Sequence, residues 1–230
     1  MPAAPQLITA IDADPRRAGR FAVLVDGRPL FSLPIDVIER LDLRIGTPVA
    51  PLREQLDREV AALKTYDRAV NMLTARARSA RDLERQLVRK GEPAEHAKAA
   101  VERLRAAGFL DDAAFARSFA RSRSLGAALA SRRLRQELAR RGVERTVADE
   151  AVSEVLEEEN VDEQANAERV ARKRLRSLEG VDVMTRRRRL YALLARRGYD
   201  PDTISKVLRR VLGAAAGDDE EPAAGDSARD

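Results

Sequence analysis

A spacing pattern that occurs three times in this sequence constrains the fold more than any other feature. Each copy has two leucines four residues apart, and four residues later a glycine that directly follows two basic residues. Leucines at this spacing share one helix face, glycine ends a helix in the left-handed conformation, and basic residues suit the last turn. The copies are Leu83/Leu87/Gly91, Leu134/Leu138/Gly142 and Leu190/Leu194/Gly198. Each copy therefore predicts a helix that ends at its glycine.

Further helices are expected on both sides of each copy. Apolar residues return ten and thirteen positions after each glycine, which predicts a helix that packs back on the first. A helical pattern also precedes each pair, so the unit is a three-helix repeat, present three times. The expected repeats cover residues 52–112, 113–161 and 162–213. Repeats of this kind predict a mainly α protein whose helices form an elongated, curved array.

The first 51 residues follow a different pattern. Three runs are apolar and rich in residues that favour strands. Asp26-Gly27, between the last two runs, is typical of a two-residue hairpin turn. Pro29 cannot donate a ladder hydrogen bond, so the third strand is expected at the edge of the sheet. Residues 1–51 therefore predict a small β meander followed by a short helix.

Charge is distributed unevenly along the chain. The formal net charge is +5, but residues 214–230 contain six acidic residues and one arginine. Residues 1–213 consequently hold 42 basic and 32 acidic residues, a net charge of +10. The small, polar C-terminal segment has too little apolar area to form a core, which predicts a disordered acidic tail. The basic body favours an acidic protein surface or nucleic acid as the partner.

No catalytic constellation is present. The chain has no cysteine and one histidine, His96, and it lacks a glycine-rich phosphate loop and a nucleophile elbow. Asp111 and Asp112 are adjacent carboxylates, and their place before a helical pattern predicts a helix cap rather than a metal site. No apolar run approaches the ~20 residues of a membrane helix, and no secretory signal is visible. We therefore expect a cytoplasmic protein that is not an enzyme and has no metal or cofactor.

Arginines gather in clusters in the second and third repeats. The candidate contact residues are Arg121, Arg123, Arg132, Arg133, Arg135, Arg172, Arg174, Arg186, Arg187, Arg188 and Arg189. Two clusters, Arg132–Arg135 and Arg186–Arg189, are expected at the starts of equivalent helices, where each positive charge opposes the macrodipole by about 0.3–1 kcal/mol. Helix stability does not explain this placement, whereas an external phosphate or carboxylate does. The alternative is a solvated face balanced by nearby acidic residues.

A longer stretch around the second repeat carries more specific information. It comprises the string from Gly108 to Phe119, then Arg123, the segment Arg133–Leu138, and Arg141-Gly142-Val143. This combination resembles the central signature of the RecX family, regulatory proteins of the RecA recombinase. The segments Leu83–Gly91 and Leu193–Tyr199 are similar to the first and third repeats of that family. The resemblance covers about residues 65–212, with Phe119 where the family often has tryptophan.

The resemblance implies a non-enzymatic modulator of RecA, mainly an inhibitor. Such proteins bind the RecA–single-stranded DNA filament and limit its growth, ATP hydrolysis, strand exchange and coprotease activity. The implied partners are the RecA filament and the phosphates of single-stranded DNA, with no membrane, and the implied processes are regulation of recombination, DNA repair and the SOS response. We expect a monomer. A second interpretation stays open: a general DNA-binding helical protein of transcription-factor type, because each glycine-capped helix pair loosely imitates a helix-turn-helix.

Overall fold

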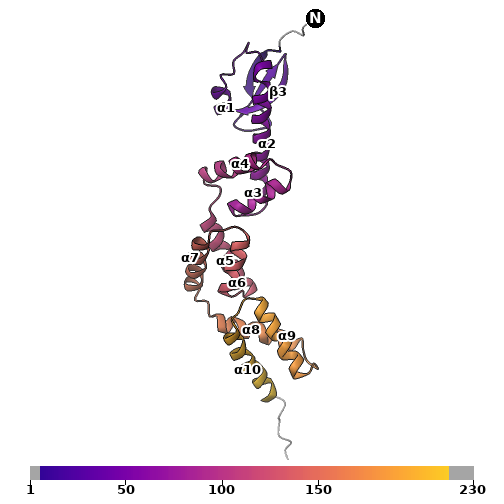
Figure 1. Cartoon of the computed structure of the whole chain (residues 1–230), viewed down its shortest axis with the longest axis vertical. Coiled ribbons are helices and arrows are strands. Elements are labelled where there is room, and N and C mark those ends of the chain that lie inside the picture. Colours follow the sequence, from indigo (N-terminus) through magenta and orange to yellow (C-terminus); the bar gives the residue numbers. More distant parts are fainter. Residues whose placement is uncertain (1–5, 218–230) are drawn as a thin grey trace, which may run out of the picture. The chain divides into compact units, whose positions relative to one another are not determined.

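The computed structural model describes residues 6–217, which contain three strands and ten α-helices (Figure 1). The chain forms two compact units, Met1–Leu110 and Asp111–Asp230, and each is described by itself. The first unit contains the sheet and one three-helix repeat, and the second unit contains two such repeats. The predicted mainly α fold, with three helical repeats after a small sheet, is confirmed.

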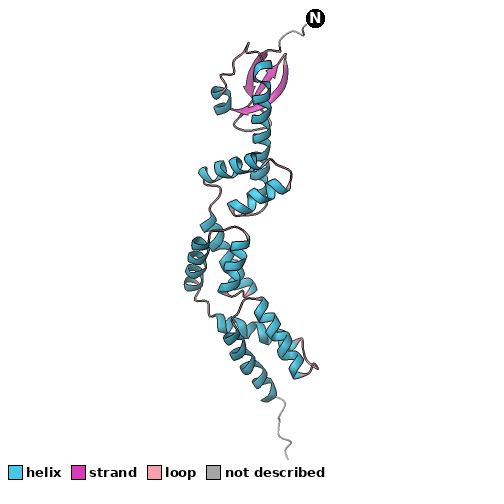
Figure 2. Cartoon of the chain, viewed as in Figure 1, coloured by secondary structure: helices cyan, strands magenta, loops and turns pink. Residues whose placement is uncertain are grey.

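The N-terminal strands form the predicted meander (Figure 2). Its strands are β1 Ile8–Ala13, β2 Arg20–Val25 and β3 Arg28–Pro34, antiparallel in the order β1-β2-β3. Asp26 and Gly27 have φ angles of +49° and +77°, as the tight hairpin turn requires. β3 pairs with β2 alone, and Pro29 thus lies in an edge strand, as its missing N–H predicts.

One helix contributes to the cores of both the sheet and the first repeat. The short helices α1 Ile35–Arg40 and η1 Ala50–Leu52 lead into α2, which runs from Arg53 to Ala75. Leu56 and Leu63, in its first half, are buried with the apolar side chains of the sheet. Ala69 and Met72, further along, are buried among α3 and α4. A continuous helix therefore links the sheet to the first repeat.

Each repeat consists of three helices in sequence. The first helices are α2, α5 Asp112–Ala127 and α8 Glu163–Arg176; the second are α3 Ala80–Arg89, α6 Ser131–Arg140 and α9 Val183–Arg196; the third are α4 Ala94–Ala106, α7 Arg145–Glu158 and α10 Pro201–Gly217. The six repeated leucines lie in the second helices and are fully buried. The three repeated glycines have φ angles of +90°, +79° and +92°. The predicted pattern of a leucine-faced helix closed by glycine is confirmed in all three copies.

The N-termini of α5 and α8 have equivalent caps. The Asp111 carboxylate accepts hydrogen bonds from the backbone N–H groups of Ala113 and Ala114, at 2.8 and 2.9 Å. Asp162 caps α8 in the same way, with bonds of 2.8 and 3.0 Å. Of the two adjacent carboxylates, Asp111 is therefore the cap and Asp112 is the first residue of the helix.

Replacing Asp111 with alanine is expected to lower the free energy of unfolding by about 1 kcal/mol, because two N–H groups lose their acceptor. Urea denaturation followed by circular dichroism measures the change. Asp111→Asn is the control, since asparagine caps helices equally well and should stay close to the original protein. An equal loss in both variants would assign the effect to charge and not to capping.

Two features of the helices differ from our expectations. α9 begins at Val183 because Asp182 accepts a hydrogen bond from the N–H of Thr185 at 2.9 Å, so Arg186–Arg189 lie beyond its first three residues. The expected placement of this cluster at a helix start is wrong. α10 continues to Gly217 through a run of alanines, the residue with the highest helix propensity, although we expected the tail to begin at residue 214. The rest of the expected tail, residues 218–230, lies outside the described residues.

Candidate functional site

The arginines predicted in the second repeat are largely engaged within the protein. The Arg121 guanidinium binds Glu159 at 2.6 Å and Glu158 at 2.7 Å, which ties α5 to the end of α7. The hydrogen bond to Glu159 is the main reason why the pKa of Arg121 is raised. The Arg123 guanidinium lies 5.7 Å from the centre of the Phe119 ring. Both arginines therefore have partners inside their own repeat.

The cluster at the start of α6 contains two arginines with acidic partners inside the repeat and one arginine without a partner among the described residues. Arg133 forms an ion pair with Glu137 at 2.7 Å, and Arg135 forms one with Asp149 at 2.9 Å. Arg132 is exposed, and its side chain has no hydrogen-bond or ion-pair partner among residues 6–217. Within this cluster, Arg132 is thus the cation available to an external anion.

The candidates in the third repeat fall into two groups. Three have partners within 3.1 Å: Arg172 binds Glu168, Arg174 donates to Ser177 Oγ, and Arg186 donates to the Val181 carbonyl. The other three, Arg187, Arg188 and Arg189, are exposed, and their side chains have no such partner in the described part of the chain. Some of the eleven predicted arginines are therefore bound to other groups of this protein, whereas others have no hydrogen-bond or ion-pair partner among the described residues.

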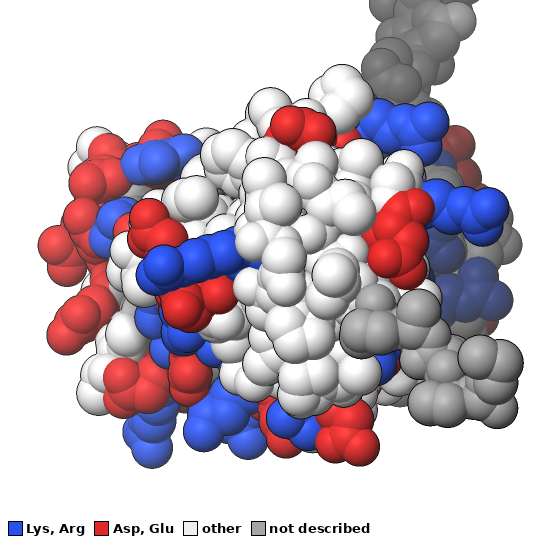
Figure 3. Space-filling model, turned by 90° about the horizontal axis from the view of Figure 1, so that it is seen from above, with Lys and Arg blue, Asp and Glu red and all other residues white. Residues whose placement is uncertain are grey.

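A cavity of about 690 Å³ in the second unit is lined by several basic residues. The cavity lies between the C-terminal end of α5, the second half of α8 and one side of α9. Six basic residues and no acidic residue line it: Arg169, Lys173, Arg174, Arg189, Arg196 and Arg197. We call it the third-repeat cavity. By contrast, the face of the molecule shown in Figure 3 carries basic and acidic side chains next to one another.

None of these six cations has a carboxylate partner among the described residues. Arg169 donates to Asn166 Oδ1 at 2.9 Å, and Arg197 donates to the carbonyl of Ala127. Lys173, Arg189 and Arg196 are exposed, and no side chain among residues 6–217 forms a hydrogen bond or ion pair with them. Like charges around one cavity repel one another, so an entering anion is stabilised by all of them. No aromatic side chain lines the cavity, so it offers charge without a platform for base stacking.

Sequence reasoning found only two of the six lining cations, Arg174 and Arg189. The signal for the others is helical spacing. Arg169 and Lys173 are four residues apart on α8, while Arg189 and Arg196 are seven apart on α9, so each pair shares a helix face. Consecutive arginines point in different directions around a helix. The runs of arginine in the sequence therefore indicated the correct helices, but they did not show which helix faces line the cavity.

The turn after α9 attaches the third repeat to the second and completes one wall of the cavity. Besides the bond from Arg197 to Ala127, the Arg197 carbonyl accepts from the N–H of Ala130 at 3.0 Å. The Tyr199 hydroxyl donates to the Ala128 carbonyl at 2.8 Å, and burial raises the pKa of Tyr199 to about 12. Tyr199 belongs to the same buried cluster as Ala128. The cavity is thus built on a joint between two repeats with fixed contacts.

The described part of the chain shows no arrangement suited to metal binding. Among residues 6–217, no three His, Asp or Glu side chains lie close enough to hold an ion. No helix in that range is both long and apolar enough to cross a bilayer.

Comparison with known proteins decides the family. The sequence matches models of the first, second and third three-helix domains of RecX at residues 66–104, 111–152 and 162–208. The chain belongs to the RecX family. Two proteins named "Regulatory protein RecX" are each 35% identical to it. The one from Mycobacterium bovis aligns over 149 residues, 63% of this chain and 84% of the relative. The one from Pelodictyon phaeoclathratiforme aligns over 152 residues, 66% of this chain and 91% of the relative.

Solved structures of RecX proteins have the same fold. The crystal structure of a regulatory protein RecX matches 90% of this chain and 99% of its own length, with a TM-score of 0.70 and 22% identity. The structure of RecX from Lactobacillus salivarius matches 66% of this chain and 97% of its own, with a TM-score of 0.53 and 15% identity. The resemblance noted in the sequence is therefore confirmed at the level of family and fold.

Proposed function

We propose that this RecX-family chain is a non-enzymatic modulator, mainly an inhibitor, of RecA. In this proposal it binds the RecA–single-stranded DNA filament as a cytoplasmic monomer and limits filament growth, ATP hydrolysis, strand exchange and coprotease activity. The relatives are named as regulatory proteins, which supports a regulatory role. The third-repeat cavity is the observation that carries the proposal, because six cations without carboxylate partners fit the phosphates of a nucleic-acid strand.

The chemistry of the cavity favours a backbone contact that ignores sequence. Arginine and lysine side chains bind phosphate oxygens and carry no information about the bases. Binding of this kind depends on salt, with a slope of log K against log salt of roughly −0.7 per phosphate on a single strand. A protein that follows the strand in this way acts by occupying the filament, for which no catalytic group is needed.

Reversing charge at Lys173, Arg189 and Arg196 tests the proposal. The three side chains are exposed, so the triple glutamate variant should fold normally, which circular dichroism will show. Each lost contact to phosphate is worth at least about 1 kcal/mol, so about 100-fold more protein should be needed to halve the DNA-dependent ATPase activity of RecA.

A matched control uses Arg176, Arg187 and Arg188, which lie on the same two helices outside the cavity lining. Their replacement by glutamate changes the net charge equally and should weaken inhibition much less. Equal weakening by both triple variants would exclude the cavity as the contact site. Undiminished inhibition by the cavity variant would overturn the proposal.

Binding measurements also separate RecA regulation from general DNA binding. The purified protein should bind RecA filaments more tightly than bare single strands or duplex in the same buffer. Equal or tighter binding to duplex DNA in the absence of RecA would favour the alternative, a DNA-binding helical protein of transcription-factor type.

A further inference from the structure

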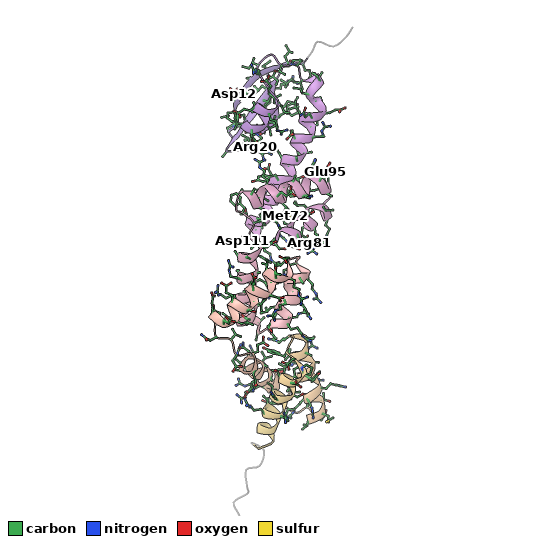
Figure 4. All side chains as sticks on the ribbon, turned by 60° about the vertical axis from the view of Figure 1, so that its left-hand side comes forward. Asp12, Arg20, Met72, Arg81, Glu95 and Asp111 are labelled. Atoms are coloured by element: carbon green, nitrogen blue, oxygen red, sulfur yellow. The ribbon has the colours of Figure 1, made fainter. Side chains whose placement is uncertain are left out.

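The first unit contains a second groove lined by cations. It has a volume of about 560 Å³ and lies between α2 and α3, with Arg78 from the segment that connects these helices. Met72, labelled in Figure 4, belongs to its lining on α2. No acidic side chain lines the groove, and Arg68, Arg78 and Lys90 supply its positive charge. We call it the first-repeat groove.

This groove and the third-repeat cavity occupy equivalent positions of their repeats. Each α2 residue that lines the groove has a counterpart 102 residues later that lines the cavity, in α8 or at its C-cap. For the groove residues in α3 and at its C-cap the offset is 107 residues, and the counterparts lie in α9 and at its C-cap. The equivalent pairs are Arg68 and Val170, Asn71 and Lys173, Met72 and Arg174, Ala75 and Ser177, Gln86 and Leu193, and Lys90 and Arg197.

Buried residues that line neither site confirm both offsets. Thr65 and Ala69 of α2 are fully buried, and so are Ala167 and Ala171 of α8, which lie 102 residues later. Leu83 and Leu190, fully buried in the second helices, are 107 residues apart. The repeat architecture itself therefore places a hollow between the first and second helices.

The second repeat fills the equivalent place with its own side chains. Phe119 stands at the position of Arg68 and Val170, and Arg141 stands at the position of Lys90 and Arg197. The Arg141 guanidinium lies 4.4 Å from the centre of the Phe119 ring and forms an ion pair with Glu137 at 2.6 Å. The hydrogen bond from Arg141 is the main reason why the pKa of Glu137 is lowered. An aromatic ring and an internal ion pair thus take the place that a ligand has room to enter in the other repeats.

We propose that the first-repeat groove is a second phosphate-binding site for single-stranded DNA, so that each compact unit carries one such site. The inference rests on the proposed function, because it assigns the same ligand to an equivalent hollow. The first-repeat groove is the weaker site. Arg68 is already paired with Glu92 at 2.6 Å and Arg78 with Asp82 at 3.1 Å, whereas the Lys90 ammonium has no partner among the described residues.

Lys90→Glu and Arg89→Glu form a matched pair of variants for the test. Both residues are exposed at the end of α3, their replacement changes the net charge equally, and only Lys90 lines the groove. The original chain and each variant, all as residues 1–230, are titrated into fluorescent oligo-dT over a range of salt concentrations. Lys90→Glu should weaken binding about 5- to 10-fold and flatten the slope of log K against log salt by roughly 0.7, the value of one phosphate contact. Arg89→Glu should change the affinity less than about 2-fold.

The outcomes separate this inference from the proposed function. If the third-repeat triple variant loses oligo-dT binding while Lys90→Glu and Arg89→Glu behave alike, the first-repeat groove is not a site and the proposed function stands. If Lys90→Glu relieves RecA inhibition with unchanged oligo-dT affinity, the groove binds acidic protein and the inference is overturned. If the original protein neither binds oligo-dT nor inhibits RecA, the proposed function itself fails.

Discussion

Replacing Gly198 with alanine is expected to destabilise the second unit by about 2–5 kcal/mol. Gly198 has a φ angle of +92°, a left-handed conformation that costs an alanine roughly 1–2 kcal/mol. A Cβ atom at this position would also meet the backbone of Arg133, with the nitrogen at 2.9 Å and Cα at 3.1 Å. Relief of this overlap requires movement of α6, and overpacking of this kind typically costs about 1–3 kcal/mol more.

Gly91→Ala provides the control for the steric part of this prediction. Gly91 is the equivalent residue of the first repeat and has a φ angle of +90°, but no atom lies within 4 Å of a Cβ added to it. Only the backbone cost of about 1–2 kcal/mol is therefore expected there. Urea denaturation of each variant measures the loss. Equal losses of unfolding free energy at the two glycines would show that the close approach to α6 adds nothing to the cost of Gly198→Ala.

Truncating Tyr199 to alanine is expected to cost about 3–5 kcal/mol, the usual range for removal of a buried aromatic side chain. Tyr199→Phe isolates the hydroxyl, whose loss leaves the Ala128 carbonyl without this donor and should cost about 1–3 kcal/mol. Because the joint forms a wall of the third-repeat cavity, both variants should also weaken binding to single-stranded DNA, the alanine variant more strongly.

The raised pKa of Tyr199 gives this joint a pH dependence. Tyrosine in the unfolded chain ionises near pH 10, whereas Tyr199 in the folded protein keeps its proton up to about pH 12. The folded state therefore binds more protons in this window, and its stability falls as the pH rises from about 10 to 12. The decline should be smaller in Tyr199→Phe when the free energy of unfolding is measured across this range. An unchanged decline would show that Tyr199 does not contribute to it.

Local patterns in the sequence were sufficient to predict most of the fold. Leucines four residues apart and a following glycine identify three helices, and Asp26-Gly27 identifies a hairpin. Each of these patterns depends only on the conformation of the segment that contains it, so no knowledge of tertiary contacts is needed. The start of α9 escaped prediction because this helix begins at Val183, seven residues before Leu190, whereas α6 begins only three residues before the equivalent Leu134. The connections between helices vary in length, and the repeat pattern does not record this variation.

The candidate site was less accessible from the sequence because it depends on which helices face each other. Arg121 finds its acidic partners 37 and 38 residues away, at the last residue and the C-cap of α7, and Arg135 of α6 finds Asp149 on α7. A count of charges along the chain cannot separate these neutralised arginines from Arg189 or Arg196. The third-repeat cavity exists only once α8 and α9 are packed, because its lining combines cations of α8 with cations at and after the end of α9 that lie more than twenty residues further along the chain.

The start of α6 has a consequence for the order in which the chain can fold during synthesis. The equivalent helices of the first and third repeats are capped by residues of their own, Ser79 and Asp182, whereas Ala130 offers α6 no side-chain cap. Instead the Ser131 N–H donates to the Glu163 carboxylate at 2.7 Å, and the Ala130 N–H donates to the Arg197 carbonyl. A ribosome delivers both acceptors after the second repeat. The N-terminus of α6 therefore has both of these acceptors only after α9 and its closing turn have emerged from the ribosome.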